Sequence, residues 1–516
     1  MDKKRSLLNV STSIISHILL LIAALVVRRF LIQRIGNDVN GLNSLYTSIL
    51  GVLAVAELGI GRAIIYSMYR PIINDDRKLV AALYGLYKKM YRIIGIVIFA
   101  AGLLITPFLP VLISDYESID VNVYTTFILM LVSVVLSYFY SAKTALIEAH
   151  KDNYITTGIA TVCSLIRYVL QMVVILLWPS FTIYLFCNII STLLVWIVTG
   201  LVTGKKYGDI IAAHETVDDG TKAEIIRNVK AMFLHKVGTV MVNSADSMII
   251  SAFIGVVILG KYSNYNYIAT SMVGIITLFF TPLTSVIGHL CAAGDKNETK
   301  KYFDFFFSIN YILGVVFFLG YFSVIDYVVV LLFGTGLEVS RAIAFIITLS
   351  RFISYMRNAA LLFRNASGTF YNDRWKPAAE GIVNVVLSIT FVKVFPEDLR
   401  VVGVIVATII TTLLICDTVE PYVIYKHVFG KPVKKFYIRN YSYICFFIIS
   451  LMVLTRLRYD SSSPVTGILV NGAVSIILSA ITLLIVAAID KTFRNNVVAI
   501  AKKAASNSFN LRLPHY

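Results

Sequence analysis

Long runs of apolar residues recur along the whole chain and are separated by short polar stretches. An α-helix rises 1.5 Å per residue, so about 20 apolar residues are needed to cross a hydrocarbon core about 30 Å thick. By this criterion we predict membrane helices at residues 7–34, 42–69, 83–113, 121–149, 154–178, 181–203, 226–255, 260–292, 301–333, 340–366, 376–395, 401–427, 437–456 and 465–489. The pattern therefore predicts an all-α polytopic membrane protein with about fourteen transmembrane helices.

Part of the sequence is repeated. The repeat pairs Ile35, Gly36, Gly41, Ser44, Tyr46 and Ile49 with Ile254, Gly255, Gly260, Ser263, Tyr265 and Ile268, at the same spacing. Each copy joins the first two helices of a predicted set of six, and both sets begin on the same side of the membrane. We therefore predict two parallel six-helix lobes, residues 1–215 and 216–432, followed by two helices and a cytoplasmic tail in residues 433–516. Chance similarity between two apolar segments is the alternative.

Composition and charge support this interpretation. Hydrophobic residues make up 58% of the chain and charged residues only 15%, so lipid must solvate most of the apolar surface. With the N-terminus inside, most Lys and Arg residues fall in cytoplasmic segments, whereas the outer loop at residues 115–120 is acidic. Both termini are therefore expected in the cytoplasm. Membrane topology and contact with anionic lipids explain the net charge of +17, and nucleic acid is not an expected partner.

Several predicted helices carry a cation near the middle of the membrane. A central charge costs about 2.5–3.5 kcal/mol, so it is expected to pair with another group or to face a watery cavity. At 100° per residue, Arg28 lies on the polar face of the first helix and Arg29 points about 100° further round. Four helices present such polar faces, whose cations and aromatic neighbours are Arg28, Arg167 with Tyr168, Lys236, and Arg351 with Tyr355.

Two acids are expected to support these cations. Glu57 is interpreted as a partner for Arg62 or Arg28, and Asp246 shares the polar face beside Lys236. Structural ion pairs between helices, or basic side chains that reach the membrane interface, are the alternative for each single residue.

Other classes of site are excluded by their missing motifs. The chain has no GxxxxGK[ST] phosphate-binding loop and no HExxH or other clustered ligand set, so neither ATP hydrolysis nor a metal is expected. The five cysteines are scattered singly. All predicted outer loops are short, which argues against an enzyme. No cofactor is expected.

Six stretches resemble a known family of exporters. They are GLNSLYTSILGVLAVAELGIGRAIIYSMYRP (41–71), YKKMYRIIG (87–95), NSADSMIISAFIG (243–255), YSNY (262–265), RWKPAAEGIVNVVLSI (374–389) and VEPYVIYKHVFGKPVKKFY (419–437). Together they resemble Wzx-like polysaccharide repeat-unit flippases of the multidrug/oligosaccharidyl-lipid/polysaccharide exporter superfamily. The resemblance implies a protein of the bacterial plasma membrane that moves undecaprenyl-diphosphate-linked oligosaccharide from the cytoplasmic to the outer leaflet for capsule, O-antigen or exopolysaccharide synthesis. It also implies two lobes that form a V and open alternately, and an arginine near the end of the first helix, matched by Arg28 or Arg29.

The site hypothesis combines the charge pattern with this resemblance. Four cations, Arg28, Arg167, Lys236 and Arg351, are expected to hold the diphosphate, while Tyr168 and Tyr355 contact sugar. Membrane voltage can drive an anion outward, and coupling to Na⁺ or H⁺ remains open. A polysaccharide polymerase is a further expected partner. Two alternatives stay open, namely a flippase for the peptidoglycan precursor lipid II and a cation or drug antiporter of the same superfamily.

Overall fold

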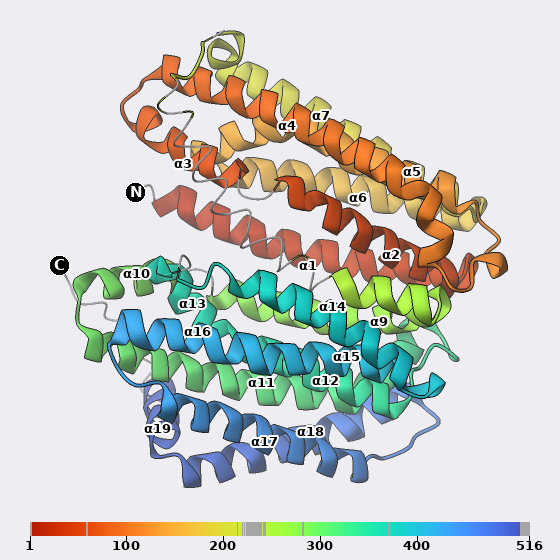
Figure 1. Cartoon of the computed structure of the whole chain (residues 1–516), viewed down its shortest axis with the longest axis vertical. Helices are drawn as coiled ribbons and strands as arrows, with labels where there is room; N and C mark the ends of the chain where they lie inside the picture. The colour runs from red at the N-terminus through yellow and green to blue at the C-terminus, as the bar shows by residue number, and fades with distance from the viewer. Residues whose placement is uncertain are drawn as a thin grey trace. The chain divides into compact units, whose positions relative to one another are not determined.

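The structure, a computed structural model, describes residues 3–505 apart from 58–59, 214, 219, 221, 223–239, 241–243, 281–282 and 370–371 (Figure 1). Within these residues the chain is helical and contains no β-strand. Ten of the described helices are long and apolar enough to cross a membrane. The all-α, multi-pass fold class predicted from hydropathy is therefore confirmed.

The helices follow one another with short connections. The first part of the chain forms α1 (Lys3–Arg34), α2 (Asn37–Leu53), α3 (Ile60–Ile73), α4 (Arg77–Ile105), α5 (Val123–Ala149), α6 (Asn153–Leu177) and α7 (Phe181–Ala212). Residues 244–253 are also helical. The remainder forms α9 (Val256–Phe280), α10 (Leu283–Ala293), α11 (Lys296–Phe333), α12 (Arg341–Met356), α13 (Asn358–Ser367), α14 (Lys376–Val394), α15 (Arg400–Thr411), α16 (Asp417–Ile424), α17 (Lys434–Arg456), α18 (Pro464–Ile489) and α19 (Lys491–Ala505).

Two predicted spans were wrong in one respect, because each is interrupted. The span at 42–69 ends its α-helix at Leu53, passes through a 3₁₀ turn at Ala54–Glu57 and resumes at Ile60. The span at 340–366 divides at Arg357 into α12 and α13. The span at 260–292 contains α9 and α10, and residues 281–282 between them lie outside the described residues. Hydropathy measures how much apolar chain is present, and it is insensitive to a change of backbone direction inside an apolar run. The seventh predicted span, 226–255, lies largely outside the described residues.

The span predicted at 401–427 contains two widened turns. Residues Thr412–Cys416 and Tyr425–Phe429 are wound as π-helix on either side of α16. Such turns insert an extra residue and are frequent at functional positions in helices. Helix α19, which follows α18 directly, was not predicted; its Phe493 is fully buried.

The chain divides into two compact units. The first comprises Met1–Asn264, Leu332–Leu337 and Arg374–Val404, and the second comprises Tyr265–Leu331, Glu338–Asp373 and Ile405–Tyr516. In the first unit α1 packs on α6, and α5 packs on both α4 and α7. In the second unit α17 packs on α12 and α18, while α13 packs on α10 and α16 (Figure 1). The predicted lobe boundaries at 215 and 432 stay predictions.

The two copies of the sequence repeat adopt the same local backbone. Gly36 precedes α2 with φ of 141°, and its counterpart Gly255 precedes α9 with φ of 128°. Side-chain-bearing residues rarely adopt these angles, so glycine at both positions allows the sharp turn into the next helix.

Within the first unit, the repeated glycines bring α2 and the start of α9 into backbone contact. A Cβ atom on Gly41 would overlap the carbonyl oxygen of Val256, and a Cβ atom on Gly260 would overlap that of Asn37. The Asn37 side chain also donates a hydrogen bond to the Val257 carbonyl at 2.8 Å. The contact is thus reciprocal, because each helix presents a glycine to the main chain of the other.

Candidate functional site

Arg28 lies beside this contact between α2 and the start of α9. Its Nε donates to Asn264 Oδ1 at 2.9 Å and its Nη2 donates to Ser263 Oγ at 2.6 Å. Asn40 of α2 donates to the same Asn264 oxygen at 3.2 Å. Arg28 is half-buried whereas Arg29 is exposed, in agreement with the difference in facing predicted from helical spacing.

Arg167 of α6 is held by neutral groups. Its guanidinium lies 4.5 Å from the ring centroid of Tyr168, and its Nη1 donates to Asn188 Oδ1 at 3.2 Å. Gln171, one turn further along α6, donates to the same oxygen at 3.1 Å. The Arg167 Nε is buried without a hydrogen-bond partner. No carboxylate of the described residues pairs with this arginine, so its positive charge is not neutralised locally.

The two arginines share one region of the first unit. Helices α1 and α6 pack against each other, and α6 also packs on α7, which carries Asn188 and the buried Tyr184. We call Arg28, Arg167, Gln171, Tyr184 and Asn188 the arginine site. It combines two guanidinium groups with neutral amide and hydroxyl groups. Such donors suit the oxygens of a phosphate or diphosphate, which accept charge-assisted hydrogen bonds from arginine in a bidentate manner.

The second unit contains the other predicted arginine. Arg351 of α12 is half-buried and makes no hydrogen bond or ion pair with the residues described. Tyr355 is only 2% exposed and its ring packs 5.6 Å from that of Phe318. Tyr355 is therefore a packing residue in this conformation, which does not favour the predicted contact with sugar. Arg357, which follows α12, pairs with Glu420 of α16 at 2.7 Å.

The structure describes the surroundings of both predicted supporting acids. Glu57 lies in the 3₁₀ turn after α2 and accepts a hydrogen bond from Tyr91 Oη at 2.9 Å, and the Tyr91 ring stacks on Tyr87 at 4.3 Å. Asp246 is buried, at 7% exposure, in the helical segment 244–253. The role of both acids in holding the cations stays a prediction.

Two of the predicted residues cannot be placed against the others. Lys236 lies outside the described residues, and so does the side chain of Arg62, although the Arg62 backbone belongs to α3.

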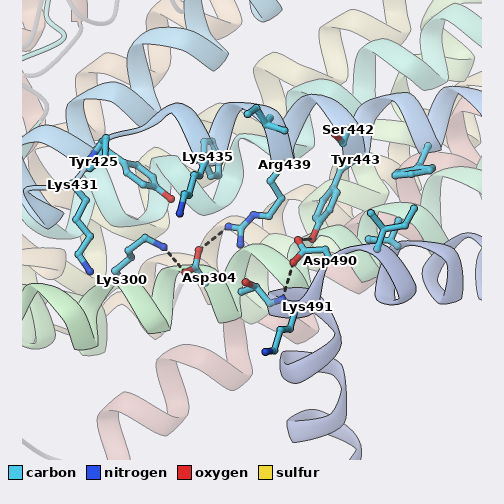
Figure 2. A pocket seen from close by; sticks show the side chains of 17 residues that line it. Lys300, Asp304, Tyr425, Lys431, Lys435, Arg439, Ser442, Tyr443, Asp490 and Lys491 are labelled. Atoms are coloured by element: carbon cyan, nitrogen blue, oxygen red, sulfur yellow. Dashed lines mark hydrogen bonds and ion pairs between the residues drawn. The ribbon is translucent and has the colours of Figure 1, made fainter.

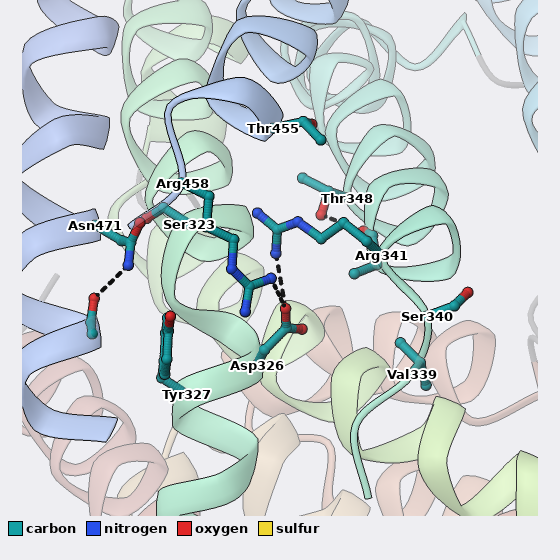
Figure 3. Close-up of polar contacts among 12 residues, drawn as sticks. Ser323, Asp326, Tyr327, Val339, Ser340, Arg341, Thr348, Thr455, Arg458 and Asn471 are labelled. Atoms are coloured by element: carbon teal, nitrogen blue, oxygen red, sulfur yellow. Dashed lines mark hydrogen bonds and ion pairs between the residues drawn. The ribbon is translucent and has the colours of Figure 1, made fainter. Parts of the chain in front are cut away.

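One charged cluster was missed by the sequence reasoning. Asp326 of α11 accepts hydrogen bonds from Arg341 Nη1 at 2.9 Å and from Arg458 Nη1 at 2.7 Å (Figure 3). Its other oxygen accepts from Tyr265 Oη at 2.7 Å. An aspartate near the end of an apolar run was the available signal. Its partners come from distant parts of the sequence, at the start of α12 and just after α17, so no spacing rule could have connected them.

Comparison with known proteins identifies the fold. No protein-family model matches the sequence, and no curated protein matches it significantly. Among solved structures, the chain is similar to the lipid II flippase MurJ in an inward closed conformation, with a TM-score of 0.59 and 12% identity over 92% of this chain and 98% of that one. It is also similar to an inward-facing multidrug resistance MATE family transporter of the MOP superfamily, with a TM-score of 0.57 and 13% identity over 78% and 96%.

A third similar structure is that of a point mutant of the Vibrio cholerae MATE transporter VcmN, with a TM-score of 0.52 and 12% identity over 83% of this chain and 98% of that one. At these identities the likeness concerns the fold. The chain therefore shares its fold with these flippase and transporter structures.

Proposed function

We propose that this protein is a flippase that moves a diphosphate-linked oligosaccharide on an isoprenoid lipid from the cytoplasmic to the outer leaflet of a bacterial plasma membrane. The product would serve the synthesis of a surface polysaccharide. The observation that carries the proposal is Arg167, a membrane arginine with a buried, unused N–H group and only neutral partners among the described residues. The fold and the resemblance of several sequence stretches to repeat-unit flippases support it.

The proposed chemistry follows from the groups that accept hydrogen bonds from Arg167 and Arg28. The amide and hydroxyl oxygens that accept from them are neutral acceptors, which a doubly charged headgroup can replace. A hydrogen bond to a charged group contributes about 1.5–3 kcal/mol, roughly twice the contribution of a neutral one, so exchange toward phosphate oxygens is favourable. Asn188 and Gln171 are then free to bind sugar hydroxyl groups. A cationic drug would be repelled by the Arg167 guanidinium, whose charge no described carboxylate neutralises, and this argues against an antiporter of cations.

The membrane potential can supply the driving force. With the inside negative, each negative charge that moves outward across 100 mV gains about 2.3 kcal/mol. A diphosphate that stays charged in the arginine site therefore needs no coupled ion for net outward movement. Flipping that depends on voltage and is unchanged when Na⁺ is replaced by K⁺ would support this mechanism.

The decisive experiment measures flipping by charge-neutral variants. Purified protein in liposomes is supplied with a fluorescent undecaprenyl-diphosphate oligosaccharide, and a membrane-impermeant quencher reports the fraction that has changed leaflet. We expect Arg167→Gln and Arg28→Gln to slow flipping at least tenfold, since each removes charge-assisted hydrogen bonds worth about 1.5–3 kcal/mol. Arg29→Gln, adjacent on α1 but exposed, is the matched control and should flip at the normal rate. Normal flipping by both site variants would refute the arginine site.

Complementation in cells separates the substrates. The solved structure of a lipid II flippase shares the fold, and lipid II carries the same diphosphate, so the arginine site suits either lipid. Rescue of a strain that lacks its capsule or O-antigen flippase would support the proposal. Rescue of a strain depleted of its peptidoglycan-precursor flippase, without rescue of the first, would assign the chain to lipid II instead.

A further inference from the structure

A cavity of about 650 Å³ lies in the second unit, where α11, α17 and α19 begin and α18 ends (Figure 2). Five cations line it, namely Lys300, Lys431, Lys435, Arg439 and Lys491, against two carboxylates. The cavity therefore carries a formal charge of about +3. It is separate from the arginine site, which belongs to the first unit. By the predicted topology, these helix ends lie on the cytoplasmic side of the membrane.

Both carboxylates of the cavity are already occupied. Asp304 accepts from Lys300 at 2.6 Å and from Arg439 at 2.7 Å. Asp490 accepts from Tyr443 Oη at 2.6 Å and from the backbone N–H of Thr492 at 2.8 Å, and so caps the start of α19. These acids hold the surrounding groups in place. They leave an excess of positive charge for a ligand.

Several hydrogen-bond donors of the cavity are not used within the part of the protein that the structure describes. Lys435 makes no hydrogen bond or ion pair with any described residue, and the Nε of Arg439 has no partner there. Both side chains extend from α17 toward Asp304 on α11 (Figure 2). The Arg439 guanidinium also lies 4.8 Å from the ring centroid of Phe307, which fixes its position. The cavity thus presents a preformed group of cations in one place.

Part of the cavity wall is apolar. Ile438 on α17 and Ile489 on α18 are 61% and 67% exposed, and Phe446 lies two turns further along α17. Both α17 and α18 are candidate membrane spans, so these exposed apolar side chains suit contact with lipid. The cations are gathered at the end of the span and the apolar side chains continue into it. This order of polar and apolar groups matches that of a phospholipid, whose phosphate lies at the interface and whose acyl chains lie below it.

We propose that this cavity binds the headgroup of an anionic glycerophospholipid from the cytoplasmic leaflet. Lys435, Lys300 and Arg439 contact the phosphate, and Ile438 and Ile489 contact an acyl chain. Basic pockets between membrane helices on the cytoplasmic side bind anionic headgroups in this way. The bound lipid bridges α11 to α17 and α18, and so stabilises the last two membrane helices against the rest of the second unit. The inference does not depend on the transported substrate.

The test uses the purified full-length protein, freed of lipid in detergent. Four probes are added in turn: dioleoyl phosphatidylglycerol, dioleoyl phosphatidylcholine, undecaprenyl monophosphate and inorganic phosphate. Thermal stability is measured for each, and native mass spectrometry measures the bound lipid. We expect phosphatidylglycerol to stabilise the protein. One cation near an anionic headgroup contributes about 1 kcal/mol of binding free energy, so phosphatidylglycerol should bind Lys435→Gln about fivefold more weakly than the wild type. Lys435 forms no bond to the described residues, so this variant should fold normally.

Two controls make the result specific. Lys301→Gln, on the same helix as Lys300 but exposed and outside the cavity, should bind phosphatidylglycerol like the wild type. Ile438→Ser should weaken binding of dioleoyl but not of dihexanoyl phosphatidylglycerol, because only the long chain reaches that side chain. The proposal is overturned if phosphatidylcholine or inorganic phosphate stabilises the protein equally, or if Lys435→Gln and Lys301→Gln behave alike. It is also overturned if undecaprenyl monophosphate binds in a Lys435-dependent manner and phosphatidylglycerol does not.

Discussion

Removing the carboxylate of Asp326 should destabilise the second unit, mainly because Arg341, one of its two arginine partners, then has no carboxylate to pair with. Asp326 is 9% exposed and accepts hydrogen bonds from Arg341, Arg458 and Tyr265. Arg458 also contacts Asp460 at 3.0 Å and therefore keeps a partner in Asp326→Ala. Arg341 has no second carboxylate among the described residues, and its Nε and Nη2 are already unsatisfied. The variant leaves Arg341 as an uncompensated, largely buried charge.

The magnitude follows from that burial. Breaking a buried ion pair by removing one partner costs about 3–5 kcal/mol. The side chains of Arg341 and Arg458 are 22% and 25% exposed, so partial hydration places the cost near the lower end of this range. For a unit of this size, a loss of about 3 kcal/mol lowers Tm by roughly 6–12 °C. Replacing Arg341 by Met in the same chain should recover at least half of that loss, because the stranded charge is gone, whereas replacing Arg458 should recover little.

The assay is heat inactivation of a fluorescent-protein fusion in detergent, with surviving monodisperse protein measured by size-exclusion chromatography after a fixed heating time. Asp209→Ala is the control, because Asp209 and Arg77 form an exposed pair at 52% and 67% side-chain exposure, and such pairs contribute little. It should leave Tm unchanged. The reasoning fails if Asp326→Ala unfolds at the wild-type temperature. It also fails if Arg458→Met, rather than Arg341→Met, restores stability to Asp326→Ala.

Two further predictions concern single positions. Gly41→Ala should lower Tm and expression, because the added methyl group would overlap the Val256 carbonyl. Gly158→Ala in α6 is the control and should be neutral or slightly stabilising, because a methyl group there meets nothing within 4 Å. The same chromatographic assay compares the two variants. Backbone N–H groups in the first turn of α11 hold the pKa of Asp295 below its usual range. The ionised Asp295 carboxylate therefore contributes to stability above about pH 4, and this contribution is lost as the pH falls through the lowered pKa. Between pH 6 and 3, Tm of Asp295→Ala should therefore fall less than that of the wild type; parallel curves would contradict this assignment.

Hydropathy predicted the membrane spans well because lipid leaves the backbone little choice. A chain in hydrocarbon must satisfy its own N–H and C=O groups, so an apolar run of sufficient length becomes a helix. The same periodicity separated Arg28 from Arg29, since helical rotation depends only on residue spacing. Interruptions such as the 3₁₀ turn ending at Glu57 were not predictable by this route. They keep the chain within the membrane and change only its local winding.

The partners of charged residues were the least predictable part. Glu57 was expected to support an arginine, and its hydrogen bond from Tyr91 was not foreseen. Tyr355 shares a helix face with Arg351, yet it is buried against Phe318. Each outcome depends on how neighbouring helices are rotated and shifted along their axes, and this information is not contained in the spacing of a single helix. The resemblance to repeat-unit flippases predicted a transporter-like membrane fold but did not place these side chains.

The reciprocal glycines of α2 and the start of α9 restrict how these two segments can move. Translation of one helix along the other would drive a larger side chain, such as Leu42 or Asn40, into the space that now holds only hydrogen atoms. Rotation about the point where Gly41 meets Val256 requires no side chain to be repacked there. Angular motion between the two segments is therefore less costly than sliding, and this point can serve as a pivot.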